Sequence, residues 1–232
     1  MLWWKRGPEF RSASELRSPA FDVHKNLSIR EKRKLIRIGV VDDNIFAPHR
    51  NLENMEYNID FLGDIAAIQK LTPYQIVLCD LQGVGTALDA KKQGAFLIRE
   101  IKKNLPEKYV VAYTGGGLNQ TITREAASDA DRLLKKDADI DEWSETLDEL
   151  ILKLLNPYNV WQRQRRALVD RDVDTLTMLK LESAFVSSLD KSQPARKATS
   201  FENYLRSDDF KGDIRAIMQG LISSGLYSLI SK

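Results

Sequence analysis

Residues 38–43 read Ile-Gly-Val-Val-Asp-Asp, a short apolar run that ends in two adjacent carboxylates. Two later runs, at 76–79 and 109–113, end in the same way, in Asp80 and Thr114. Short apolar runs of this kind are typical of the buried strands of a parallel sheet. Open α/β sheets bind ligands beyond the carboxyl ends of their strands. We therefore expect four polar side chains to meet at one edge of the sheet: Asp42, Asp43, Asp80 and Thr114.

Three carboxylates at one edge would repel one another. Two like charges about 4 Å apart, at an effective dielectric near 20, cost on the order of 4 kcal/mol, so a cation is implied. Hard oxygen ligands of this kind favour Mg²⁺. A lysine pair, Lys135 and Lys136, follows a fourth apolar stretch, and one lysine with one Mg²⁺ would bring the cluster close to neutrality. Asp80 is then suited to accept a phosphoryl group, because an ionised carboxylate needs no general base.

From residue 35 the chain alternates short apolar runs with stretches of helical period. The expected strands are Leu35–Val41, Ile59–Leu62, Ile76–Asp80, Tyr109–Thr114 and Arg132–Leu134. The expected helices between and after them are Arg50–Tyr57, Asp64–Leu71, Ala87–Asn104, Asn119–Asp129 and Ile140–Leu155. This alternation predicts an α/β domain over residues 35–156, with a five-stranded parallel sheet covered on both faces.

The two flanking segments differ from this domain. Residues 1–34 are basic, with a net charge of +5, and show no sustained period, so we expect a tail or linker with one helical turn. Residues 157–232 carry a net charge of +3, against −6 for 35–156, and read as an all-helical extension. Its expected helices are Trp161–Asp170, Val173–Leu189, Phe201–Leu205 and Asp209–Ser231. The apolar stripe of the last helix is typical of a core or of a dimer seam.

Four motifs together resemble the receiver domain of two-component response regulators: Ile-Gly-Val-Val-Asp-Asp, Ile-Val-Leu-Cys-Asp, Val-Val-Ala-Tyr-Thr-Gly and Ala-Asp-Arg-Leu-Leu-Lys-Lys-Asp-Ala. The resemblance covers roughly residues 35–156. It implies a flavodoxin-like (βα)5 fold and a reversible switch, driven by phosphoryl transfer to Asp80 from a partner histidine kinase or phosphotransfer protein. It also implies Mg²⁺ held by Asp42, Asp43 and Asp80, with Thr114 and Lys136 contacting the phosphoryl group. The family spacing favours Lys136 over Lys135.

Two features depart from the family pattern. The family usually has Met-Pro-Gly-Met-Asp-Gly after the phosphoacceptor strand, whereas this chain has Leu-Gln-Gly-Val-Gly at 81–85 and an extended loop. The aromatic residue expected three positions before the lysine is Leu133, which puts the usual coupling of threonine and aromatic ring in doubt unless Tyr113 replaces it. Nearby glycines at 115–117 are expected to let backbone amides approach the phosphoryl oxygens.

These features lead us to expect a signalling switch, with no enzymatic activity beyond its own phosphorylation and dephosphorylation, whose output is protein contact through the helical extension. Its lone cysteine, Cys79, is expected to be a packed side chain and favours a reducing compartment, so we expect the protein in the cytoplasm. Neither a secretory signal nor a membrane span is expected.

Three alternatives stay open. The receiver could be an unphosphorylated scaffold for constitutive assembly, or the extension could form a homodimer. The third alternative is a regulator that binds DNA through the arginines at 163–166, but nucleic acid is not an expected partner because the net charge of this segment is modest. Those arginines are better read as the solvated face of a helix, with Trp161 packed against the receiver.

Overall fold

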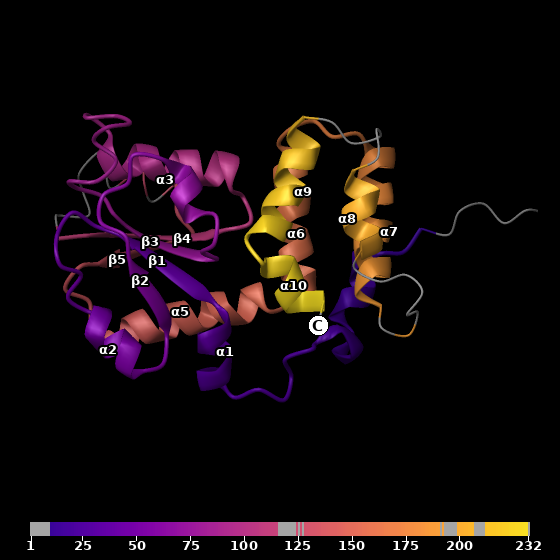
Figure 1. Ribbon diagram of the computed structural model, residues 1–232, viewed down its shortest axis with the longest axis horizontal. Coiled ribbons are helices and arrows are strands. Elements are labelled where there is room, and N and C mark those ends of the chain that lie inside the picture. The colour runs from indigo at the N-terminus through magenta and orange to yellow at the C-terminus, as the bar shows by residue number, and fades with distance from the viewer. Residues whose placement is uncertain are drawn as a thin grey trace, which may run out of the picture.

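The computed structural model describes residues 10–115, 124, 126, 128–190, 192, 199–206 and 212–231. Five strands form one parallel sheet in the order β2-β1-β3-β4-β5 (Figure 1). The strands are β1 (Arg37–Val41), β2 (Asn58–Phe61), β3 (Ile76–Asp80), β4 (Tyr109–Thr114) and β5 (Arg132–Lys135). This strand order is that of the doubly wound, flavodoxin-like fold. The predicted five-stranded parallel sheet of a flavodoxin-like fold is therefore confirmed, with β3 and β4 at the predicted bounds and the other strands shifted by one or two residues.

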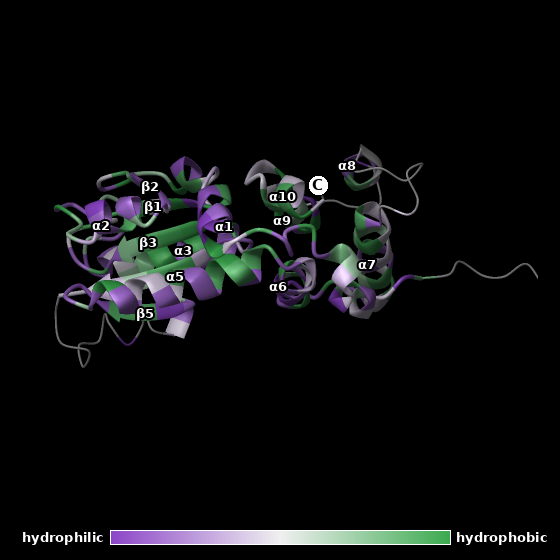
Figure 2. Ribbon diagram, turned by 90° about the horizontal axis from the view of Figure 1, so that it is seen from below, coloured by the Kyte–Doolittle hydropathy of each residue, from purple (hydrophilic) through white to green (hydrophobic). Residues whose placement is uncertain are grey.

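The central strands are buried on both faces, which is why they read as continuous apolar runs. Alternate residues face opposite sides of the sheet. In β3, Ile76 and Leu78 join a core that includes Leu147 of α5 (Ile140–Leu154), whereas Val77 and Cys79 join the core under α3 (Gln93–Asn104). In Figure 1, α3 lies above the strands and α5 below them, and Figure 2 colours the central strands as hydrophobic.

Helices α3 and α5 lie inside their predicted ranges, and α2 (His49–Asn54) begins one residue before its predicted start and ends three residues before its predicted end. The second crossover differs from prediction. We expected a helix over Asp64–Leu71, and the structure has only a short 3-10 helix, η3 (Ile68–Leu71). The Asp64 Oδ1 atom accepts hydrogen bonds from the N–H group of the next residue, Ile65, and from that of Gly85 in the loop after β3, and these two bonds hold the start of the segment as a loop. The helix predicted over 119–129 lies partly outside the described residues; positions 124, 126, 128 and 129 are helical.

The described part of the extension is helical throughout, as predicted. It comprises α6 (Pro157–Val169), α7 (Thr175–Leu189), α8 (Thr199–Leu205), α9 (Asp213–Ser223) and α10 (Leu226–Ser231). Helix α6 begins four residues before its predicted start, because Asn156 caps its N-terminus and Pro157 fits the first turn. The single helix predicted over 209–231 is two helices, which break at Gly225, where φ is +76°. Its apolar stripe is core: Ile217, Met218 and Leu221 are buried.

The N-terminal segment differs from the expected tail. Residues 10–35 form two 3-10 helices, η1 (Ala13–Arg17) and η2 (Pro19–Phe21), and the helix α1 (Ile29–Leu35). In η1, Ala13 and Leu16 are buried against α6 and α7. The two oxygens of Glu182 join these elements: one accepts the N–H of Ala13 at 2.8 Å and the other the indole N–H of Trp161 at 2.9 Å.

One apolar core runs from the sheet into the extension. It continues from Trp143 and Leu147 of α5 through Trp161 of α6 to Phe185 and Phe201. At its far end four rings pack together at centroid distances of 5.2–6.2 Å: Trp161, Phe185, Phe201 and Tyr227. Among the described residues, none of the helices is long and apolar enough to cross a membrane.

Candidate metal centre

The acidic side chains do meet at the carboxyl ends of the strands. Val41 pairs with Cys79 and Asp80 with Tyr113, so Asp42 and Asp80 follow neighbouring strands at the same level. One carboxylate oxygen from each of Asp42, Asp43 and Asp80 lies within 4.8 Å of the other two. Asp42 and Asp80 are buried while Asp43 is exposed, so the cluster opens to solvent on the Asp43 side.

Asp42 is held by donors from three parts of the chain. Its Oδ1 atom accepts the backbone N–H of Asn44 at 2.8 Å. Its Oδ2 atom accepts the hydroxyl of Tyr113 at 2.8 Å and lies 2.9 Å from the Nζ atom of Lys136. A fully buried carboxylate needs such compensation, because burial of an unpaired charge costs several kcal/mol.

Lys136 reaches two of the three carboxylates. Its Nζ atom lies 2.7 Å from Asp80 Oδ2 and 2.9 Å from Asp42 Oδ2. Burial lowers the pKa of Lys136, but the hydrogen bonds and negative charges of Asp80 and Asp42 outweigh it, so the pKa lies above its usual value. The ammonium group is therefore charged at neutral pH. Lys135, the last residue of β5, is exposed.

The donor set fits a divalent cation. Three carboxylates and one ammonium leave a formal charge of −2, and carboxylate oxygens are the ligands that hard divalent cations prefer. The loop after β3 lies against the cluster: a Cβ atom added at Gly83 would be 2.3 Å from Asp43 Oδ2. A side chain there would displace the Asp43 carboxylate, so the backbone of this loop closes one side of the site. Asp42, Asp43 and Asp80 are the residues that would hold the ion.

Thr114 lies where predicted, buried at the end of β4. Its carbonyl accepts the N–H of Lys136 at 2.9 Å, so the backbone fixes the residue after β5 to the end of β4. Of the glycines predicted to approach a phosphoryl group, Gly115 is described, and a Cβ atom there would lie 4.0 Å from Lys136. Positions 116 and 117 lie outside the described residues.

Tyr113 does not take the place left by Leu133. The tyrosine ring belongs to the core under α5, whereas Leu133 packs against the core on the α3 side of the sheet. The pKa of Tyr113 is strongly raised, first by burial and then by the charge of Asp42, so its hydroxyl stays protonated and donates. From the sequence, Tyr113 is expected to matter only as an aromatic ring. No local pattern indicates that its hydroxyl contacts Asp42, 71 positions earlier in the chain.

Cys79 is a packed side chain, as expected. It is fully buried, and burial strongly raises the pKa of its thiol, so it is not ionised at neutral pH. Its Sγ atom lies 3.3 Å from the carbonyl oxygen of Asp80. The thiol therefore contributes packing behind the site and no nucleophile.

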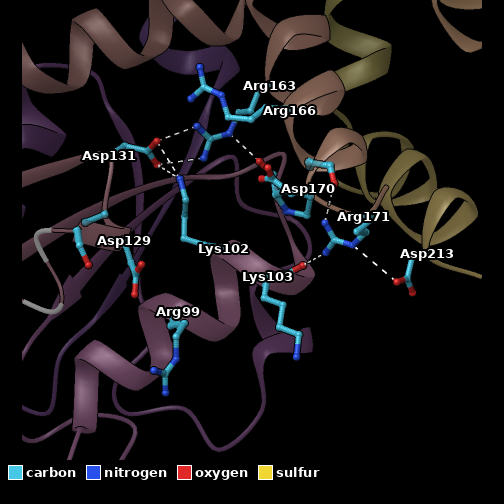
Figure 3. A pocket seen from close by; sticks show the side chains of 14 residues that line it. Arg99, Lys102, Lys103, Asp129, Asp131, Arg163, Arg166, Asp170, Arg171 and Asp213 are labelled. Carbon is cyan, nitrogen blue, oxygen red and sulfur yellow. Dashed lines mark hydrogen bonds and ion pairs between the residues drawn. The ribbon is translucent and has the colours of Figure 1, made fainter. Parts of the chain in front are cut away.

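A second charged cluster lies where the extension meets the sheet-containing domain, around a pocket of about 670 Å³ (Figure 3). Asp131 binds Lys102 of α3 at 2.9 Å and Arg163 of α6 at 2.7 Å. Trp161 is fully buried, as predicted, and its ring stacks on that of Phe185 of the extension. Arg165 and Arg166 are exposed, as predicted. Arg163 instead turns inward to Asp131, a partner that no local sequence pattern indicates.

No protein-family model and no curated protein matches the chain. Its fold is similar to solved receiver-type structures. A CheY-like receiver domain from Methanospirillum hungatei JF-1 is 17% identical over 50% of this chain and 93% of its own, with a TM-score of 0.42. A response regulator from Thermotoga maritima is 20% identical over 50% and 97%, with a TM-score of 0.40.

A response regulator from Burkholderia pseudomallei, solved with a phosphorylated aspartic acid, calcium ion and citrate, is 18% identical over 80% of this chain and 97% of its own, with a TM-score of 0.39. Sequence identities and TM-scores this low do not support an inference about function. The fold assignment depends on the strand order, and the chemistry depends on the contacts of the site.

Proposed function

We propose that this chain is a two-component response regulator. Asp80 accepts a phosphoryl group in a Mg²⁺-dependent reaction from a histidine kinase or phosphotransfer protein, and the phosphorylated site changes the protein contacts of the helical extension. One observation carries this proposal: the Asp80 carboxylate lies 2.7 Å from a charged lysine and within 4.8 Å of two further carboxylates. We propose no other enzymatic activity, and we place the reaction in the cytoplasm.

The residues of the site have separate roles in the transfer. An Asp80 oxygen attacks phosphorus, and the P–N bond to the donor imidazole breaks as the new P–O bond forms. Lys136 stands beside Asp80 and offsets the charge of the phosphoryl oxygens, and Thr114 offers a hydroxyl donor at the end of the neighbouring strand. Mg²⁺, held by Asp42, Asp43 and Asp80, would supply further charge neutralisation when bound.

The extension is attached to the strand that carries the site lysine. β5 begins directly after Asp131, which binds Arg163 of α6, and ends directly before Lys136, which binds Asp80. A movement of Lys136 towards a phosphoryl group would therefore act on the same short strand that anchors α6. This connection supports the proposal that the extension is the output.

The proposal is tested by incubating the protein with Mg²⁺ and acetyl phosphate and measuring its intact mass. We expect one phosphoryl adduct that is stable in acid and labile in base, that maps to Asp80, and that is lost in Asp80→Asn. The matched control is Asp60→Asn, which changes an aspartate of β2 outside the cluster and keeps the adduct. An unmodified mass, while a known receiver domain is modified in parallel, would contradict the proposal.

A second candidate is a constitutive scaffold, favoured by the single core that joins the sheet to the extension. In that case Asp80→Asn would leave the cellular output and all partner contacts unchanged. Under the first proposal the same substitution abolishes the response to the kinase while the protein stays folded.

A further inference from the structure

The hydroxyl of Tyr113 is placed to control which oxygen of Asp42 in the acidic cluster a cation can bind. Tyr113 is fully buried, and three neighbouring groups fix it: the ring centroid lies 5.3 Å from that of Phe46 and 5.5 Å from that of Trp143, and its hydroxyl lies 2.8 Å from Asp42 Oδ2. Phe46 follows the Asp42 loop and Trp143 belongs to α5. Packing therefore sets the position of the hydroxyl before any ligand arrives.

The contacts of Asp42 leave few positions for a metal ion. A carboxylate offers about four acceptor positions, two on each oxygen. Among the described residues, Tyr113 and Lys136 take those on Oδ2, and the N–H of Asn44 takes one on Oδ1. The remaining position is on Oδ1. The tyrosine and the lysine thus select which oxygen of Asp42 a cation can use.

We infer that Tyr113 is a positioning residue for the divalent cation, acting through Asp42 without touching the ion. This inference rests on the proposed function and deepens it, because it assigns a metal-tuning role to a residue outside the carboxylate cluster. Hydrogen-bond partners of metal ligands typically change metal affinity by about 10- to 100-fold when they are removed.

The test measures binding of Mg²⁺ alone by isothermal titration calorimetry to the full chain and two variants. Tyr113→Phe keeps the ring and removes the hydroxyl. Its control is Tyr57→Phe, which removes a hydroxyl that donates to Asp148 at 2.7 Å, outside the site. We expect Tyr113→Phe to bind Mg²⁺ about 10- to 100-fold more weakly and Tyr57→Phe to bind it as the parent does.

The outcomes separate this inference from the proposed function. If the parent binds Mg²⁺ and is phosphorylated but Tyr113→Phe binds the ion equally well, the positioning role is wrong and the proposed function stands. If Tyr113→Phe weakens Mg²⁺ binding but the parent is never phosphorylated, the inference stands and the proposed function fails. If Tyr57→Phe weakens binding as much as Tyr113→Phe, or if the parent binds no Mg²⁺, the inference is overturned.

Discussion

Arg163 of α6 forms a bidentate ion pair with Asp131, the residue that directly precedes β5. Its Nη1 and Nη2 atoms lie 2.7 Å and 3.0 Å from the two carboxylate oxygens (Figure 3). The same guanidinium also donates to the carbonyls of Pro106 and Lys108. This arginine comes from the helical extension, and every one of those acceptors belongs to the sheet-containing domain. The Arg163–Asp131 ion pair therefore holds α6 of the extension next to β5, the strand that ends directly before Lys136.

Arg163→Ala should lower the free energy of unfolding by about 2 kcal/mol, because it leaves a mostly buried carboxylate with Lys102 as its remaining cation. Urea denaturation measures this change. Arg165→Ala, on the exposed side of the same helix, is the matched control and should change stability by less than about 0.5 kcal/mol. Equal effects of the two substitutions would contradict the role of the pair.

The same pair predicts a pH dependence. Burial raises the pKa of Asp131, but the charge and hydrogen bond of Arg163, the charge of Lys102 and the hydrogen bond from the Val110 backbone outweigh it, so the pKa lies below its ordinary value. A carboxyl group with a lowered pKa stabilises the fold above its unfolded pKa, near 3.9, and loses that contribution as the pH falls through the folded pKa. The stability deficit of Arg163→Ala should therefore be full at pH 6 and shrink below about pH 4. A deficit that is constant down to pH 3, in urea titrations at each pH, would refute this.

Gly83→Ala should weaken Mg²⁺ binding by about 10-fold, because the new methyl group would lie 2.3 Å from the Asp43 carboxylate and displace it. The control is Gly63→Ala, which places a methyl group on a glycine of similar φ, +68° against +77°, but meets nothing within 4 Å. In both variants the free energy of unfolding should fall by about 1 kcal/mol, because a residue with a Cβ atom is strained in the left-handed backbone conformation. Calorimetric titration should show weaker Mg²⁺ binding for Gly83→Ala alone.

Lys136→Ala should reduce the rate of Asp80 phosphorylation by acetyl phosphate about 100-fold, because it removes the charged donor 2.7 Å from the acceptor carboxylate. Lys135→Ala, the neighbouring exposed lysine, should keep the parental rate. The rate is followed by intact mass at fixed Mg²⁺. A larger effect of Lys135→Ala would reverse the assignment of the two lysines.

The local pattern of the amino-acid sequence is enough to specify the sheet and the residues at its carboxyl edge. Runs such as 76–79 and 109–113 are apolar at every position, which specifies strands buried on both faces. The polar residue that follows each run, Asp80 or Thr114, must then lie at the ligand-binding edge. The helix predicted in the second crossover does not form, because the Asp64 carboxylate accepts the N–H of Ile65 and that of Gly85, 21 positions later in the chain. Hydrogen bonds between a side chain and the backbone compete with the helix that the sequence period favours.

Contacts between groups far apart in the chain depend on how the elements pack. Tyr113 and Asp42 are 71 positions apart and Arg163 and Asp131 are 32 apart, and each pair is joined by the packing of whole strands and helices. The N-terminal segment is another example of burial that the local pattern does not predict. Residues 10–35 carry no sustained period, yet Ala13 and Leu16 are buried because η1 packs against α6 and α7. Local pattern sets the elements, whereas burial of charges and apolar surface between elements depends on partners that no local pattern contains.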